Sequence, residues 1–148
     1  MTKMKRKTNK KRRASEKGRL SVRRGSDVAR GKMSEVVVDI ARPWIKRLGP
    51  NPPLPAVEFA YQTCRLVWNV SRLSNAEKDR KDLFNKVAQE VVALAPRGTE
   101  MEMQQLVEEL YRRALQLYPD DPRIIVNMEV TDLGDGNFHV SVASTQGQ

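Results

Sequence analysis

Residues 54–73, which read LPAVEFAYQTCRLVWNVSRL, decide the fold of this chain. Placed at 100° per residue, the stretch is apolar around most of a helix and leaves only a narrow polar sector. Pro55 suits a first helical turn, so we expect one helix over the whole stretch. Because its apolar side chains point in most directions, we place this helix in the middle of a bundle. One apolar group comprises Val57, Tyr61, Cys64 and Trp68, and the other comprises Phe59, Leu66, Val70 and Leu73.

The polar sector of this helix is a candidate partner face. Its members recur three or four positions apart and therefore share one direction. Such a row on an otherwise buried helix could bind an acidic peptide or RNA, but we favour the interpretation that it is a solvent face. A solvent face implies that Asn69→Ala changes stability by no more than about 0.5 kcal/mol. The row consists of Glu58, Gln62, Arg65, Asn69 and Arg72.

A helix is predicted on the N-terminal side of this stretch. Apolar residues recur every four positions over 36–48, with Ser34 as the expected N-cap. Pro43 should kink or shorten this helix, because proline lacks an N–H and clashes with the preceding turn. Residues 49–53, Gly-Pro-Asn-Pro-Pro, form a connector that cannot be helical.

Two further helices are predicted on the C-terminal side. Ser74-x-x-Glu77 and Thr99-x-x-Glu102 are capping-box patterns, which are typical of helix starts. The third helix should bury Leu83, Phe84, Val87, Val91 and Leu94, and the fourth should bury Met103, Leu106, Val107, Leu110, Tyr111, Ala114, Leu117 and Tyr118.

The spacing of apolar residues changes from helical to alternating after Pro122. Residues 124–130 and 138–142 alternate, and a glycine-rich turn at 133–137 joins them, which predicts a β-hairpin. An isolated hairpin is marginal in water, so its apolar face should pack on the helices, and we expect the fourth helix to receive it. The predicted fold class is α+β, mostly α: four packed helices with a C-terminal two-stranded β-hairpin.

Charge divides the 148 residues into two unlike parts. Residues 1–32 hold 14 basic and two acidic residues, a net +12, so the other 116 residues carry −3 of the total of +9. The basic segment has too few apolar residues to offset the entropy that folding would cost. We therefore expect a disordered cationic arm over 1–33, a single domain over 34–144, and a disordered tail over 145–148.

The arm predicts contact with nucleic acid or ribosomal RNA. Basic residues that neutralise phosphates release counterions, which favours binding to any nucleic acid, and no aromatic residue lies among them to stack on bases. The same basic clusters would serve as a nuclear-import signal in a eukaryote. The alternatives are an inert tail or translation that starts at Met33. We assign phosphate contacts to Lys3, Lys5, Arg6, Lys7, Lys10, Lys11, Arg12, Arg13, Lys17, Arg19, Arg23 and Arg24.

Residues that carry enzyme chemistry are few. The single cysteine, Cys64, cannot form an internal disulfide, and with the single histidine, His139, it cannot supply a structural zinc site. Cys64 lies on an apolar stripe, as a small hydrophobe would, and His139 lies on the predicted outer face of a strand. The aspartates that flank the hairpin, Asp120, Asp121, Asp132 and Asp135, are better explained by turn chemistry than by a calcium loop. We expect no catalytic residue, metal or cofactor.

Membrane association is also not predicted. No run of 18 apolar residues is present, and the first 32 residues contain no hydrophobic segment of a secretory signal. We expect a cytoplasmic protein, or a nuclear one if the source is eukaryotic.

Residues 34–43, SEVVVDIARP, followed by Val67-Trp68-Asn69, resemble a group of short bacterial proteins of unknown function. In that group a helix that ends in an Ala-x-Pro step precedes a helix that carries Trp-Asn. The resemblance covers residues 34–73 and implies no activity. Those proteins begin near the position of Met33, so the basic arm departs from the group.

Two functions follow from these observations. The leading hypothesis is a small non-enzymatic protein whose arm contacts nucleic acid or ribosomal RNA electrostatically. The alternative is an acidic helical protein-interaction module in which the arm is inert or untranslated.

Overall fold

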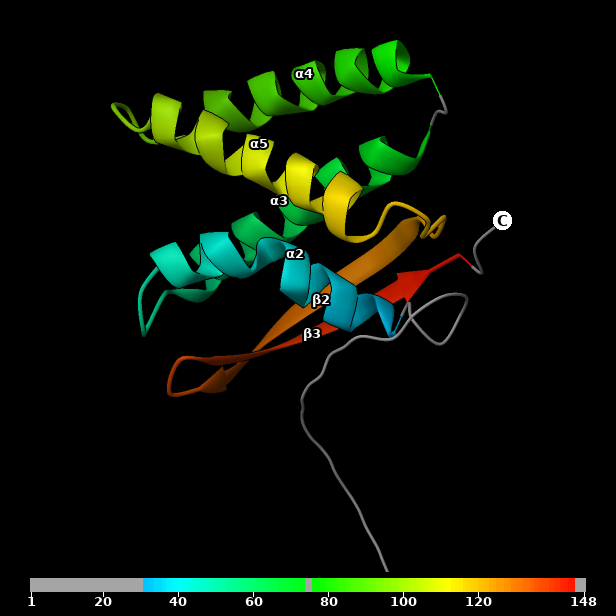
Figure 1. Ribbon diagram of the computed structural model, residues 1–148. Helices are drawn as coiled ribbons and strands as arrows, with labels where there is room; N and C mark the ends of the chain where they lie inside the picture. Colours follow the sequence, from blue (N-terminus) through cyan, green and yellow to red (C-terminus); the bar gives the residue numbers. More distant parts are fainter. Residues whose placement is uncertain (1–30, 74–75, 146–148) are drawn as a thin grey trace, which may run out of the picture. The chain divides into compact units, whose positions relative to one another are not determined.

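The computed structural model describes residues 31–73 and 76–145, which form four helices and one antiparallel β-hairpin (Figure 1). This confirms the predicted α+β class. The basic residues at 1–30 and the tail residues 146–148 lie outside the described residues, so the disorder expected of them is untested. The elements are α2 (Met33–Arg47), α3 (Leu54–Leu73), α4 (Glu77–Ala93), α5 (Glu100–Leu117), β2 (Ile125–Gly134) and β3 (Asn137–Ser144).

Helix α3 is the central element, as the sequence predicts. It packs against α2, α4, α5 and β2, and nine of its 20 residues are buried. The stripe that contains Cys64 and Trp68 is fully enclosed. The second apolar stripe is only partly buried, because Leu66 and Leu73 are exposed while Val70 is enclosed.

Helix α2 starts two residues earlier than expected, at Met33. Lys32 is the N-cap residue and makes no side-chain cap bond, so the prediction of Ser34 as N-cap is wrong. The Met33 side chain is buried in the core, which draws this residue out of the predicted arm and into the first turn. A helix that begins at Met33 places Ser34 inside that turn.

The proline in α2 is accommodated without ending the helix, which continues to Arg47. Pro43 cannot donate to the carbonyl of Asp39, four residues before it. Arg113 of α5 supplies the missing donor. Its Nη2 donates to the main-chain carbonyl of Asp39 at 2.8 Å, and its Nε donates to the main-chain carbonyl of Ile40 at 3.1 Å. The carbonyl that Pro43 leaves without a donor in α2 is therefore bonded by a side chain of α5.

The predicted capping boxes do not form among the described residues. Ala76 is the N-cap of α4, and Ser74 lies outside the described residues. Thr99 is the N-cap of α5, as predicted, but its hydroxyl donates to the Pro96 carbonyl at 2.6 Å. Glu102, the other half of that box, instead pairs with Arg47 of α2.

The buried faces of α4 and α5 are narrower than predicted. In α4 only Phe84, Ala88 and Val91 are buried, and the expected core residues Leu83 and Leu94 are exposed. Because α4, in the part of the chain that the structure describes, packs mainly on α3 and α5, one apolar stripe is enough to cover these contacts. In α5 the buried residues are Leu106, Val107, Leu110 and Ala114, whereas Leu117 is exposed.

The hairpin turns at Asp135 and Gly136, which both have positive φ, as a two-residue turn requires. A Cβ at Gly136 would lie 2.4 Å from the Pro50 main-chain oxygen, so the turn fits tightly against the connector between α2 and α3.

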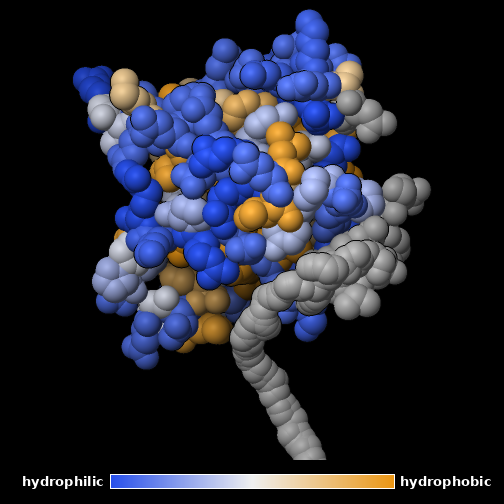
Figure 2. Space-filling model, in the orientation of Figure 1, coloured by the Kyte–Doolittle hydropathy of each residue, from blue (hydrophilic) through white to orange (hydrophobic). Residues whose placement is uncertain are grey.

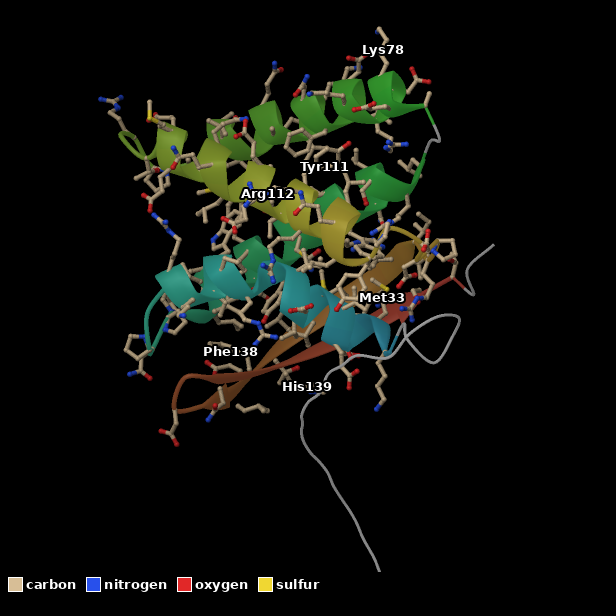
Figure 3. The ribbon with its side chains drawn as sticks, viewed as in Figure 1. Met33, Lys78, Tyr111, Arg112, Phe138 and His139 are labelled. Carbon is tan, nitrogen blue, oxygen red and sulfur yellow. The ribbon has the colours of Figure 1, made fainter. Side chains whose placement is uncertain are left out.

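The two faces of β3 differ: Phe138 points toward the helices, and His139 points to the opposite face (Figure 3). At the other end, Thr145 bonds to Ile124 through its N–H and its hydroxyl, so this expected tail residue extends the hairpin.

The hairpin does not pack on α5 as predicted. Strand β2 lies against α3, and β3 lies against α2. The physical reason is the polar row of α3, whose side chains bond to the main chain of β2.

Candidate binding site

The polar row of α3 is mainly an internal structure. The side-chain amide of Asn69 pairs with the peptide groups of Ile125 in both directions. Its Nδ2 donates to the Ile125 carbonyl at 2.9 Å, and its Oδ1 accepts the Ile125 N–H at 2.8 Å. Asn69 therefore acts toward β2 much as a neighbouring strand would.

Two more members of the row extend this seam along β2. Arg65 Nη2 donates to the Val126 carbonyl at 3.1 Å, and Gln62 Nε2 donates to the Met128 carbonyl at 3.3 Å. Main-chain groups at the edge of a sheet can pair with another chain unless they are covered. Helix α3 covers this edge of β2 with its own side chains.

The expectation that the row is a solvent face is wrong for four of its five members. Gln62, Arg65, Asn69 and Arg72 bond to main-chain oxygens elsewhere in the molecule, and Glu58 is exposed. The row has a structural role, and a further role as a partner face stays a prediction.

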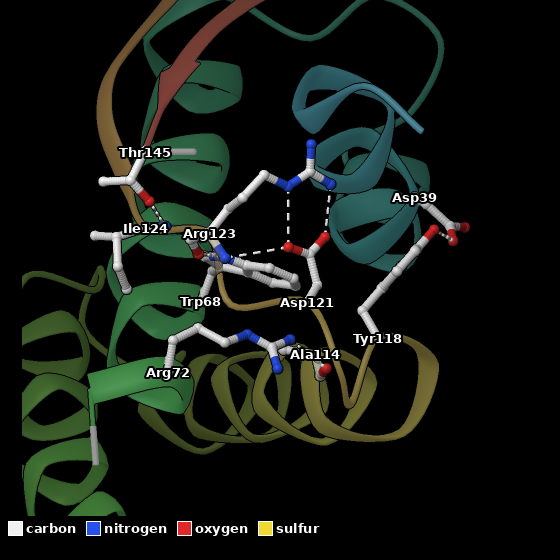
Figure 4. A network of polar contacts seen from close by, with 9 residues as sticks. All are labelled: Asp39, Trp68, Arg72, Ala114, Tyr118, Asp121, Arg123, Ile124 and Thr145. Carbon is white, nitrogen blue, oxygen red and sulfur yellow. Dashed lines mark hydrogen bonds and ion pairs between the residues drawn. The ribbon is translucent and has the colours of Figure 1, made fainter. Parts of the chain in front are cut away.

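A second polar network surrounds Trp68 at the C-terminal end of α3 (Figure 4). Trp68 Nε1 donates to the Arg123 carbonyl at 2.8 Å, and the Arg72 guanidinium lies 3.7 Å from the centre of a Trp68 ring. A cation over an aromatic face is attracted by the ring quadrupole. Arg72 is fixed further by a 2.7 Å bond from Nη2 to the Ala114 carbonyl of α5.

The carboxylate of this network is Asp121, which is only 4% exposed. Arg123 neutralises it with a two-point contact, at 2.9 Å from Nε and 2.6 Å from Nη2, and also donates its main-chain N–H. This fork geometry is the strong form of an arginine–carboxylate pair. The loop before β2 is therefore closed on itself beside Trp68.

A cavity of about 390 Å³ opens beside this network. It lies where the C-terminal end of α3, the first turns of α4, the end of α5 and the loop before β2 meet. Arg72 borders it, and burial lowers the pKa of Arg72 to about 10. Its Nε is buried and has no hydrogen-bond partner among the described residues. The lining residues are Ser71, Arg72, Arg80, Leu115, Pro119, Asp120, Asp121 and Pro122.

No motif in the sequence marks this cavity. The sequence predicts Arg72 only as part of the polar row and Asp121 only as a turn residue, and it gives no role to Arg80. The Asp121-x-Arg123 spacing is the one local signal, because an acid and a base two positions apart in a turn can pair. No sequence pattern indicates that the end of α3, the start of α4, the end of α5 and the loop before β2 meet in space.

The two residues considered for enzyme chemistry, Cys64 and His139, lie in different environments. Cys64 is buried, and burial raises the pKa of its thiol to about 12, so it stays protonated near neutrality. His139 is exposed on the outer face of β3. Among the described residues no group of three His, Cys, Asp or Glu side chains is arranged to hold a metal ion.

The basic residues assigned to nucleic-acid binding, at positions 3–24, lie outside the described residues. The face of the domain drawn in Figure 2 is mostly hydrophilic, with small separate apolar areas. In the part of the chain that the structure describes, no helix is both long enough and apolar enough to span a membrane.

No family model matches this chain, and no curated protein or solved structure is significantly similar to it. The resemblance of residues 34–73 to short bacterial proteins stays an expectation.

Proposed function

We propose that this chain is a non-enzymatic binding protein that contacts nucleic acid or ribosomal RNA through the basic residues of 1–32. The observation that carries the proposal is the separation of charge: +12 on residues 1–32 and −3 on residues 33–148. Positive charge at this density attracts phosphates, whatever the base sequence.

The contacts of the folded domain support assigning phosphate binding to that segment. Arg65, Arg72 and Arg113 donate to main-chain carbonyls, and Arg123 is paired with Asp121. Arginines bound in this way hold the domain together and are not available to follow a phosphate backbone. Three more arginines, Arg42, Arg47 and Arg112, form ion pairs with acidic side chains of the domain.

Binding of this kind has a measurable signature. If six to eight basic residues meet phosphates, log K should fall against log[salt] with a slope of about −5 to −7 on duplex DNA, at about −0.9 per contact. Discrimination among base sequences should be weak, because phosphate contacts carry no base information.

The test compares two full-length variants that each replace four basic residues by glutamine. One changes the four at 10–13, and the other changes four exposed cations of the domain, so both reduce the net charge from +9 to +5. Fluorescence anisotropy with labelled duplex DNA and with labelled single-stranded RNA would be measured over a salt series. The domain positions are Lys46, Lys81, Lys86 and Arg97.

We expect the change at 10–13 to reduce the salt slope on duplex DNA by about 3 to 4, and the domain change to leave it almost unaltered. An equal loss in both variants would move the site onto the domain. Absence of binding by the unchanged chain at low salt would reject the proposal in favour of a protein-interaction module.

A further inference from the structure

The two outer edges of the hairpin differ in what covers them. The outer edge of β2 is covered, because Gln62, Arg65 and Asn69 of α3 bond to its main chain. The outer edge of β3 has no such cover: in the part of the chain that the structure describes, the main chain of β3 is hydrogen-bonded to β2 alone. Every second residue of an edge strand directs its N–H and carbonyl away from the sheet, so these groups of β3 are open to another strand.

The sequence of β3 lacks the features that usually keep an edge strand from pairing. Exposed edges are commonly protected by charged residues, prolines or bulges. The eight residues Asn137–Ser144 include no lysine, arginine, aspartate, glutamate or proline, and each has a partner in β2. The two irregularities of the ladder lie in β2, at Val126 and Leu133. Strand β3 is therefore regular along its whole length and presents no charged barrier to a further strand.

The apolar layer beside this edge is only half closed. Helix α5 contacts the flank of α2 that carries Asp39, so β3, which also packs on α2 (Figure 1), meets the opposite flank. Helical spacing places Val38 and Ile45 on that opposite flank. Both are half-buried, as are Phe138 and Val142 on the inner face of β3. A strand added to β3 would bring further apolar side chains against this layer.

We propose that two copies of this chain associate through β3, which pairs antiparallel with β3 of the second copy so that the two hairpins join into one sheet. The pairing has a two-fold axis, as most homodimers do. With the axis at Val140 or Ser141, near the middle of the strand, residues of the same face lie opposite each other. The inner apolar faces of the two copies then lie on the same side of the joined sheet.

A second copy meets the requirements of this edge by symmetry. Its β3 has the same alternation, so apolar inner residues lie beside apolar ones, and the exposed outer residues bring no acidic, lysine or arginine side chains together. Asp132 and Asp135 at the hairpin turn are the nearest acids in sequence. In an antiparallel pair the two turns lie at opposite ends, so these aspartates do not repel one another across the contact.

The size of the contact indicates a weak dimer. A standard stable interface uses roughly 20–30 residues and about 800 Å² on each partner. Strand β3 and the flank of α2 together offer about ten residues, so each copy should bury roughly 300–400 Å². Interfaces of this size form transient complexes, so association should depend strongly on protein concentration.

Sedimentation equilibrium of the full-length chain tests the proposal directly. The sample would be treated with nuclease, because nucleic acid could bridge two basic segments, and kept at physiological salt, which screens their repulsion. The average mass should rise with protein concentration from 16.9 kDa toward twice that value. A chain that stays monomeric up to millimolar concentration would overturn the proposal.

Ser141→Lys and Thr131→Lys form a matched pair of variants. Both place one lysine on the exposed outer face near Glu129, because Ser141 is its register partner and Thr131 lies two positions along the same strand. Opposite charges at such positions are favourable in a sheet, so both variants should fold, which thermal unfolding checks. We expect Ser141→Lys to weaken self-association at least tenfold, because two lysines would meet near the axis, and Thr131→Lys to change it little. Equal dimerisation by the two folded variants would overturn the assignment of the edge.

Crosslinking locates the contact with a smaller substitution. Ser141→Cys and Thr131→Cys would each be treated with a bismaleimide of short spacer, and the native Cys64 is buried away from the reagent. Ser141→Cys should form covalent dimers much faster, because only position 141 lies beside its own copy. Equal rates in the two variants would contradict pairing through β3.

A last comparison separates this proposal from nucleic-acid binding. The pairing uses residues of the described domain alone, so the chain with glutamine at 10–13 should dimerise at least as strongly as the unchanged chain. A loss of dimer in that variant would assign self-association to the basic segment. That result would overturn pairing through β3 and would leave the nucleic-acid proposal standing.

Discussion

Helices α3 and α4 have similar lengths, 20 and 17 residues, but their polar side chains have different roles. In α3, Asn69 and Arg72 bond to main-chain groups of β2 and α5. In α4, Lys78 pairs with Asp82 one turn away, and both side chains are exposed. A polar residue on α3 joins two elements, and one on α4 mainly faces water.

The number of packing neighbours explains the difference. Helix α3 packs against four other elements and buries nine residues, whereas α4, among the described residues, packs mainly on α3 and α5 and buries three. On a surrounded helix even the polar sector meets another part of the chain, where its donors must find acceptors. Five predictions test this comparison.

The largest effect is expected at Trp68, which is enclosed, donates to the Arg123 carbonyl and packs edge-on against Tyr118. Trp68→Ala should reduce the free energy of unfolding by about 3–5 kcal/mol, as large-to-small core changes do. Trp68→Phe keeps an aromatic ring but loses the N–H donor, so it should cost less. Urea unfolding measures both, and near-native stability of the alanine variant would contradict the central position of α3.

A loss of about 2–3 kcal/mol is expected for Asn69→Ala, because the N–H and carbonyl of Ile125 would lose their partners. Glu58→Ala is the control: it lies in the same polar row but is exposed, so it should change stability by less than about 0.5 kcal/mol. If both variants lost equally little stability in urea unfolding, the whole row would have to be interpreted as a solvent face.

The buried thiol of Cys64 should make stability fall at alkaline pH. Its folded-state pKa is raised by burial from 9.0 to about 12, so the folded chain retains a proton that the unfolded chain releases. The stabilisation is complete below pH 9 and is lost as the pH rises toward 12, by at most about 1.4 kcal/mol per pH unit.

Unfolding in urea with a reducing agent, measured at half-unit steps from pH 8 to 10, would give the slope of the free energy of unfolding against pH. Cys64→Ala should make this slope less steep. An unchanged slope in that variant would assign the alkaline loss to other groups, such as Tyr61, whose pKa is raised by burial to about 12.

A smaller effect is expected in the core of α4. Phe84 is buried and stacks on Tyr111 of α5, with ring centres 4.3 Å apart. Phe84→Leu removes the stacked ring but keeps an apolar side chain, so it should cost about 1–1.5 kcal/mol. Thermal unfolding would measure it, and a loss as large as that of Trp68→Ala would mean that α4 is as deeply integrated as α3.

The smallest effect is expected for Lys78→Ala. Its partner Asp82 lies at 3.0 Å, but both side chains are exposed, and such pairs contribute about 0.3–0.5 kcal/mol. A loss above about 1 kcal/mol in urea unfolding would show that α4 uses its surface charges structurally, which would remove the contrast with α3.

Periodicity and breaker residues were sufficient to predict the elements. The apolar spacing and the flanking prolines placed α3 over residues 54–73, and the alternation with a glycine turn placed the hairpin. These features are local, because the spacing of side chains along a helix or strand depends only on nearby residues. The separation of charge at residue 32 is equally a property of the sequence.

The partners of polar side chains depended on the tertiary structure. Ser34 and Glu102 have the residue types of helix caps, but neither acts as one. Met33 is buried in the core and begins α2, so Ser34 lies inside the helix, and Glu102 forms an ion pair with Arg47. A local motif specifies a possible bond, and the partner that comes closest after folding decides which bond forms.

The candidate cavity shows the same dependence over longer distances. Arg72 and Arg80 are separated by a helix boundary, and Leu115 and Asp121 follow more than 30 positions later. Only the packing of α3, α4 and α5 brings these side chains around one space. The pattern of apolar residues determines which faces are buried, whereas the packing of helices determines which charges share a cavity, because that depends on contacts between residues far apart in the chain.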